Sequence, residues 1–121
     1  PQRNIEKNSA ILDAGLRSVE TARATGVRLG FGTDLIGETQ SYQNREMQIR
    51  AEVQPAREVL DSLWNVNARL LGMEGRIGTL AEGAHGDVVV SRVNPLENLP
   101  SFADHSNAIS HVLLGGRVVR G

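Results

Sequence analysis

The chain has 121 residues, of which 40% are hydrophobic and 22% charged, and 13 lysines and arginines nearly balance 14 aspartates and glutamates. This composition is typical of a globular protein with a real core. The net charge of −1, without any basic cluster, argues against a nucleic-acid partner. The absence of cysteine excludes disulfides, thiolate chemistry and Cys-based zinc sites. No apolar run reaches the roughly 18 residues of a transmembrane helix, so we expect no membrane partner.

The first predicted element is a helix from about residue 4 to residue 25. Gly26 follows the last periodic position, where a glycine commonly ends a helix. Apart from Arg28, Val27 to Gly32 is small or apolar, as in a parallel strand covered on both faces. A helix, one glycine and a buried strand make half of an α/β repeat. The apolar stripe of the helix consists of Ile11, Leu12, Leu16, Val19 and Ala22.

Residues 35–44 form a predicted polar loop that is long for a connection after a strand, and such loops are often functional. A short helix is predicted from about 45 to 53. Pro55 suits the first turn of another helix that runs to about residue 71 and ends at Gly72. We expect Trp64 to lie in the core. The buried stripe of this last helix is predicted at Val59, Leu60, Leu63, Val66 and Leu70.

The pattern changes after Gly75 to short segments separated by turns. A strand is predicted at 87–90, and two more at 109–114 and 117–120, joined by Gly115-Gly116. Both glycines can take the positive φ that a type I′ hairpin turn requires. The chain is therefore predicted as an α/β part over residues 1–75 and an all-β part over residues 76–121.

Asp34 is the main candidate for chemistry, because it stands alone at the C-terminal tip of the predicted strand. In a (β/α)8 barrel, catalytic groups lie at this end of the strands. A carboxylate there can accept a proton from a metal-bound water or bind the metal itself. The alternative is a turn or helix-capping aspartate, which is common after strands. The residues alone leave both interpretations open.

The remaining motifs favour ordinary structural positions. Gly30-x-Gly32 is not a dinucleotide-binding fingerprint, because Leu35 occupies the place of the third glycine. The three histidines, His85, His105 and His111, show no metal-ligand spacing. No pair of acidic residues resembles a catalytic pair of carboxylates. The acidic residues of the two later helices are predicted on solvated faces: Glu46, Glu52, Glu58 and Asp61.

Taken together, these segments resemble the C-terminal part of a metal-dependent amidohydrolase, most closely the branch of imidazolonepropionase-like and Xaa-Pro dipeptidase-like enzymes. The resemblance depends on motifs that follow one another in register along almost the whole chain. The sequence departs from the family at Gly86-Asp87, where the family usually has Ala-Asp. The matching motifs are Gly26–Asp34, Pro55–Leu60, Asn67–Gly72, Gly75–Gly83, Gly86–Val90, Asn94–Leu96 and Val112–Val119.

The resemblance implies an α/β fold: the C-terminal portion of a (β/α)8 TIM barrel over residues 1–75, followed by C-terminal strands of a small β-sandwich. Asp34 would end the eighth barrel strand, contact the hydrolytic water and one metal, and shuttle its proton. We expect one or two divalent metals, as Zn2+, with the other ligands upstream of Pro1. The loop Glu38–Gln43 would form part of the substrate rim, with Tyr42 binding substrate.

The implied activity is hydrolysis of carbon–nitrogen bonds in small substrates such as dipeptides or N-acyl amino acids. Alternatives are a cyclic-amide hydrolase or deaminase on the same scaffold, and a non-catalytic assembly protein. We expect a small-molecule or dipeptide substrate and a homo-oligomer. A complete barrel takes roughly 200 residues or more, so this chain cannot close one by itself. The activity would belong to a longer parent protein.

Overall fold

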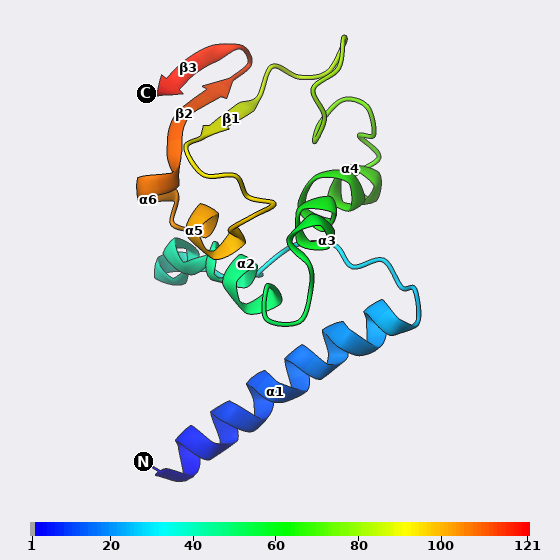
Figure 1. The fold of residues 1–121 in the computed structure, drawn as a ribbon, viewed down its shortest axis with the longest axis vertical. Coiled ribbons are helices and arrows are strands. Elements are labelled where there is room, and N and C mark those ends of the chain that lie inside the picture. Colours follow the sequence, from blue (N-terminus) through cyan, green and yellow to red (C-terminus); the bar gives the residue numbers. More distant parts are fainter. Residues whose placement is uncertain (1) are drawn as a thin grey trace.

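The first element of the computed structural model is a long helix, α1 (Gln2–Ala24), which projects from one side of the remaining helices and strands (Figure 1). The structure describes residues 2–121, with side chains from Leu12 onward. At the end of α1, Gly26 has a φ of +74°. The amide of Gly26 donates to Arg23 O over 3.1 Å, and that of Val27 donates to Ala22 O over 2.9 Å. These two bonds form a Schellman motif, which confirms the predicted helix end.

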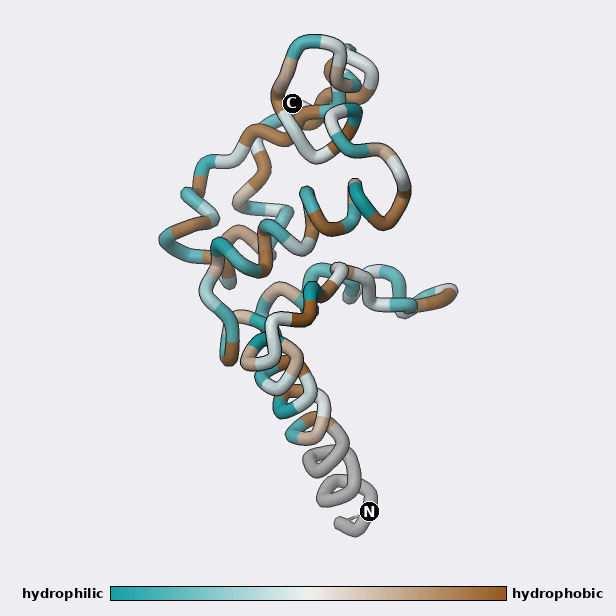
Figure 2. Tube along the Cα trace, turned by 90° about the vertical axis from the view of Figure 1, so that its right-hand side faces the viewer, coloured by the Kyte–Doolittle hydropathy of each residue, from teal (hydrophilic) through white to brown (hydrophobic). Residues whose placement is uncertain are grey.

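The predicted apolar stripe of α1 is only partly covered. Leu16, Val19 and Ala22 are half-buried, whereas the side chain of Leu12 is 49% exposed. Ile11, the fifth predicted member, lies outside the residues whose side chains are described. The tube in Figure 2 shows that α1 leads away from the body of the molecule.

The segment 27–32 differs from its prediction, because it carries no regular secondary structure. A parallel strand needs neighbouring strands to complete its hydrogen bonds. Within residues 2–121 the only sheet is formed by later residues, and none of its strands pairs with this segment. The segment is drawn out between α1 and the following helices (Figure 1). Its local sequence favours a strand, but the partners that would make one are not among the described residues.

A group of short helices follows. The predicted loop 35–44 contains a 3-10 helix, η1 (Gly37–Tyr42), and α2 (Arg45–Arg50) comes directly after it. Pro55 has an extended ψ of 144° and stands just before the next helix. That helical stretch is continuous but changes its winding, from α3 (Ala56–Asp61) through a π-helical turn, η2 (Ser62–Val66), to α4 (Asn67–Leu70).

The core lies between these helices and the C-terminal part of the chain. Its residues come from α2, α3 and the short helix α5 (Leu99–Ala103). The core prediction is wrong for two residues, since Trp64 is 42% exposed and Leu70 is 71% exposed. Both lie on the surface of the stretch from η2 to α4. The central cluster consists of Met47, Val59, Leu60, Leu99 and Ala103.

The C-terminal part forms a three-stranded antiparallel sheet in the order β1-β2-β3. The strands are β1 (Val88–Ser91), β2 (Ile109–Leu114) and β3 (Arg117–Arg120). The hairpin glycines at 115 and 116 have φ values of +56° and +78°, as the predicted turn requires.

This part is not all-β as predicted, because two short helices precede β2. They are α5 (Leu99–Ala103) and α6 (His105–Ala108). Asn98 caps α5 by accepting a hydrogen bond from Ser101 N over 3.0 Å, and Pro100 occupies the first turn. An Asn cap followed by a proline was a readable signal for this helix.

Gly86 lies at a close approach between two backbone segments. Its carbonyl accepts from Gly116 N over 2.7 Å, and a Cβ at position 86 would lie 2.7 Å from that nitrogen. We therefore expect Gly86→Ala to lower the free energy of unfolding of the full-length protein by about 1–3 kcal/mol, measured by chemical denaturation. Gly15→Ala on α1 is the control, since nothing lies within 4 Å of its Cβ. Equal stability of the two variants would show that the turn yields at no cost.

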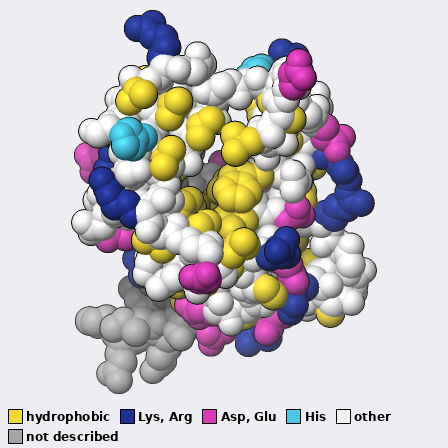
Figure 3. Space-filling view, turned by 45° about the horizontal axis from the view of Figure 1, so that its top comes forward, with side chains coloured by type: hydrophobic (Ala, Val, Ile, Leu, Met, Phe, Trp, Pro, Cys, Tyr) yellow, Lys and Arg dark blue, Asp and Glu magenta, His cyan; other side chains and the backbone are white. Residues whose placement is uncertain are grey.

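One face of the molecule carries many hydrophobic side chains that meet solvent (Figure 3). Among the described residues, the large hydrophobic side chains with high exposure include Leu80 at 83% and Ile36 at 79%, and Val118 and Val119 of β3 are exposed as well. Exposed apolar surface of this extent usually marks a contact face. In the described residues, no helix combines the length and the hydrophobicity needed to cross a membrane.

Candidate active site

Asp34 is the residue with the most unusual backbone. It has a φ of +52° and is the one non-glycine residue with positive φ among residues 2–121. This left-handed conformation costs an ordinary L-residue about 1–2 kcal/mol, and aspartate is among the side chains that tolerate it best. Its side chain is exposed. Such strain persists where the surroundings hold the backbone, and it is frequent at functional sites.

Side chains hold the backbone just before Asp34. Among the described residues, no backbone–backbone hydrogen bond involves residues 28–35. Instead, Asn67 bonds both polar groups of Phe31: its Oδ1 accepts from the amide over 2.9 Å, and its Nδ2 donates to the carbonyl over 2.8 Å. Gly32 N donates to Glu46 Oε1 over 3.4 Å. The amide of Asn67 thus replaces a neighbouring strand at Phe31.

Arg50 makes the third contact to this segment. Its side chain is only 6% exposed, and its Nη1 donates to Gly30 O over 3.0 Å and to Glu46 Oε1 over 3.3 Å. The other guanidinium nitrogens donate to Gln54 Oε1 over 2.7 Å and to Ser62 Oγ over 2.8 Å. Its Cζ lies 5.6 Å from the centre of the Phe31 ring. A buried guanidinium is tolerated because its donors are satisfied and a carboxylate lies beside it.

Tyr42 lies beside the end of the same segment. It lines a pocket of about 400 Å³ together with Gly32, Thr33 and Leu35, which flank Asp34 on both sides. Glu46 lines the pocket as well, and its Oε2 is buried with no hydrogen-bond partner in the described structure. Tyr42 itself is 61% exposed. The pocket thus joins Tyr42 to both chain neighbours of Asp34, whereas Asp34 itself is not among the residues that line it.

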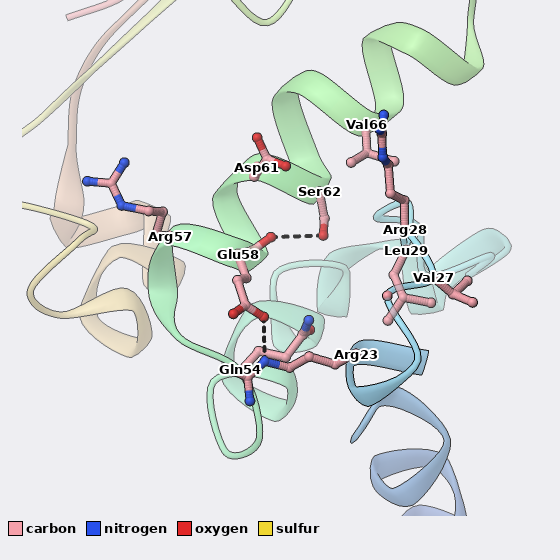
Figure 4. A pocket seen from close by; sticks show the side chains of 11 residues that line it. Arg23, Val27, Arg28, Leu29, Gln54, Arg57, Glu58, Asp61, Ser62 and Val66 are labelled. Carbon is pink, nitrogen blue, oxygen red and sulfur yellow. Dashed lines mark hydrogen bonds and ion pairs between the residues drawn. The ribbon is translucent and has the colours of Figure 1, made fainter. Parts of the chain in front are cut away.

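A second pocket, of about 440 Å³, lies at the other end of the segment (Figure 4). It is lined by Val27, Arg28 and Leu29, and Arg23 Nε donates to Glu58 Oε2 across it over 2.6 Å. This hydrogen bond and the charge of Glu58 raise the pKa of Arg23 above its ordinary value. The pair joins α1 to α3 at the end of the segment opposite Asp34, so we assign it a structural role.

The described residues do not form a metal centre by themselves. They contain no group of three or more His, Cys, Asp or Glu side chains that could hold an ion. His105 is bonded to Asn44, His85 to Arg76 and His111 to Ser110, so the histidines do not converge. Asp34 offers one carboxylate where a zinc site needs three or four ligands.

The family model described as "Amidohydrolase family" matches residues 3–119, almost the whole chain. The chain belongs to the amidohydrolase family. The expected superfamily is thereby confirmed, on a match that includes Asp34, Tyr42 and the side chains that hold the segment before Asp34.

Three proteins of known name or structure are similar to this amidohydrolase chain. It is 33% identical to a 5-methylthioadenosine/S-adenosylhomocysteine deaminase of Desulforudis audaxviator, over 98% of this chain and 31% of that protein. The crystal structure of an amidohydrolase matches with a TM-score of 0.86 and 40% identity, over 90% of this chain and 26% of the other. A prolidase complexed with N-methylphosphonate-L-proline matches with a TM-score of 0.86 and 38% identity, over 99% of this chain and 29% of the other.

The amidohydrolase chain therefore spans about a quarter to a third of the length of these relatives. This agrees with the expectation that a longer parent protein carries the activity. The likeness at 38–40% identity to solved amidohydrolases supports the expected branch, since one of them is a prolidase.

Sequence reasoning missed the residues that hold the amidohydrolase segment before Asp34. Glu46 was predicted on a solvated face, but its side chain is 19% exposed and accepts from Arg50 and Gly32. Arg50 and Asn67 were not singled out as site residues. The signal was present in the i, i+4 pair Glu46 and Arg50, which places an acid and a base on one face of α2.

Tyr42 provides a test of the substrate rim. We expect Tyr42→Ala in the full-length amidohydrolase to change KM or substrate preference several-fold while the melting temperature changes little, because the side chain is 61% exposed. Steady-state kinetics on several substrates measures this. Tyr42→Phe is the matched control, since it keeps the ring and removes the hydroxyl. Unchanged kinetics in Tyr42→Ala would mean that η1 is only a connector.

Proposed function

We propose that residues 1–75 form the end of a (β/α)8 barrel, that residues 76–121 contribute C-terminal strands of a β-sandwich, and that the parent protein hydrolyses a carbon–nitrogen bond in small substrates. The observation that carries this proposal is Asp34, held in a left-handed conformation at the end of segment 27–33, inside a family match over residues 3–119. In a barrel, that place is the catalytic edge.

Asp34 would serve as the proton carrier of the reaction. Its carboxylate would take a proton from the attacking water and deliver it to the leaving nitrogen, so that the amine departs neutral. An exposed carboxylate at the edge of a pocket can meet both groups in turn. Glu46 is less suited to this role, because its Oε1 is bonded to Arg50 and Gly32 N.

A divalent metal, which we propose is zinc, would lower the pKa of water and polarise the carbonyl of the substrate. This chain can offer Asp34 as one of its ligands, and the remaining ligands would come from residues outside these 121. The described residues hold no further candidate set.

The proposed substrates are dipeptides or N-acyl amino acids, with a dipeptide ending in proline as the first choice. The support is the likeness to a prolidase at 38% identity, with a TM-score of 0.86 over 99% of this chain. The apolar part of the pocket at Tyr42 and Ile49 could face a small ring or aliphatic side chain. We further propose that the parent is a homo-oligomer, as the extensive exposed apolar surface suggests.

A deaminase is the second candidate, because a 5-methylthioadenosine/S-adenosylhomocysteine deaminase is 33% identical over 98% of this chain. It would use the same proton transfer with a purine amine as the leaving group. A cyclic-amide hydrolase and a non-catalytic assembly protein are left as outcomes of the test.

The deciding experiment is to assay the full-length parent, loaded with zinc, on two panels of substrates. One panel holds Xaa-Pro dipeptides and N-acyl amino acids, and the other holds 5′-methylthioadenosine and S-adenosylhomocysteine. We expect release of free amino acids from the first panel only. Ammonia release from the second panel would favour the deaminase, and no turnover on either panel would favour the assembly protein.

A further inference from the structure

We propose that Asn67 and Arg50 are positioning residues that fix the Asp34 carboxylate by holding the backbone of Gly30–Gly32. The inference rests on the proposed function, because it gives Asp34 a catalytic role. It adds a mechanism for keeping that residue in place.

The backbone before Asp34 lacks the hydrogen bonds that normally hold such a segment in place. Segment 28–35 makes no backbone–backbone hydrogen bond within the described residues. The left-handed backbone at Asp34 is strained and needs neighbours that determine its course. Four backbone groups on three consecutive residues are instead bonded to the side chains of Asn67, Arg50 and Glu46. These bonds end two residues before Asp34.

The side chains of Arg50 and Asn67, which hold this segment, are themselves fixed by their partners. Arg50 is 5% exposed, and its partners Gln54 and Ser62 are 9% and 4% exposed. Every guanidinium nitrogen has a partner, so the group has one geometry that satisfies all of them. Asn67 makes both of its bonds to one residue, Phe31, which fixes the peptide plane on each side of it. Arg50 comes from α2, which contributes Met47 to the core, and Asn67 begins α4, in which Ala68 is buried.

The position of Asp34 determines whether it can carry the proton in the proposed reaction. A proton carrier must lie within hydrogen-bond reach of both the water and the leaving nitrogen, and a displacement of 1 Å can cost up to about 10²-fold in rate. Loss of either positioning residue would let the segment move with Asp34 on it. Such a loss lowers kcat and leaves substrate binding, through Tyr42 and the other loops, nearly intact.

The experiment is a set of double-mutant comparisons in the full-length parent with bound metal. We expect Asn67→Ala to lower kcat at least about tenfold with KM changed less than about twofold. In the Asp34→Asn background, the same substitution is expected to have no further effect on kcat, because the group that it positions is already gone. Arg50→Lys is expected to behave in the same way, and it supplies a second variant if one of the two fails to fold.

Asn65→Ala is the matched control. Asn65 lies two residues before Asn67 in the same helical stretch, is exposed, and bonds only Asp61, over 2.7 Å. We expect wild-type kcat from it. A second readout is independent of activity: hydrogen exchange of the peptide covering residues 27–34 should accelerate in Asn67→Ala, because the Phe31 amide loses its acceptor, and should be unchanged in Asn65→Ala.

The outcomes separate the two hypotheses. If Asp34→Asn retains near-normal kcat, the proposed role of Asp34 fails. If Asp34→Asn is impaired but Asn67→Ala and Arg50→Lys keep wild-type kcat, or if their losses add fully to that of Asp34→Asn, the positioning role is overturned and the proposed function stands. Unaltered exchange at residues 27–34 in Asn67→Ala would overturn it as well.

Discussion

Asp34→Asn in the full-length, metal-loaded protein should lower kcat by at least about 10²-fold, which is the usual contribution of general acid–base catalysis. The substitution keeps the volume and the polarity of the side chain and removes its ability to hold the proton. Asparagine also tolerates the left-handed backbone that Asp34 adopts, at a φ of +52°. The expected loss is therefore chemical and should leave the melting temperature nearly unchanged.

This kcat measurement needs two further results: the metal content of the variant and the kcat of a control variant. The metal content of the variant must be determined, because Asp34 is also a proposed ligand and a metal-free variant would be inactive for another reason. Asp61→Asn is the control, since Asp61 is exposed and its described side-chain hydrogen bond is to Asn65. Near-normal kcat in a metal-loaded Asp34→Asn protein would contradict the catalytic assignment.

The isolated 121-residue chain should associate, exchange elements with another copy, or stay partly molten. Its accessible surface is 8748 Å². A compact monomer of its mass, 13.1 kDa, exposes only about 6,400 Å² by the usual scaling. The surplus is apolar in good part, since Val27, Ile36, Leu70 and Leu71 are each more than half exposed. Segment 27–32 pairs with no other strand, and the backbone of Arg28 and Leu29 makes no described hydrogen bond, so this part of the segment is a template for pairing with another chain.

Sedimentation and hydrogen exchange on the purified chain would test this. We expect concentration-dependent association and faster exchange over residues 27–32 than in the full-length parent, most of all at Arg28 and Leu29. The full-length parent is the matched comparison, and it should protect the same peptide. A stable, monodisperse monomer with residues 27–32 protected would show that the chain is a self-sufficient domain.

The sequence by itself determined the elements whose causes are local. The helix end at Gly26 follows from a residue without a Cβ at a left-handed position, and the structure shows the corresponding Schellman bonds. The Gly115-Gly116 hairpin follows for the same reason, with both φ values positive. The family could also be inferred from the sequence, because the order and spacing of its motifs can be recognised without knowledge of the tertiary contacts.

Only the tertiary structure decided the features that depend on contacts between distant parts of the chain. Residues 27–32 have the composition of a buried strand, yet a strand exists only when another one completes its hydrogen bonds, and here side chains of Arg50, Glu46 and Asn67 do so. Trp64 and Leu70 have helical spacing typical of a core, but they are exposed, because burial depends on what packs against a face. The pocket that joins Tyr42 to the neighbours of Asp34 likewise arises from the path of the chain through η1 and α2, which no single motif in the sequence encodes.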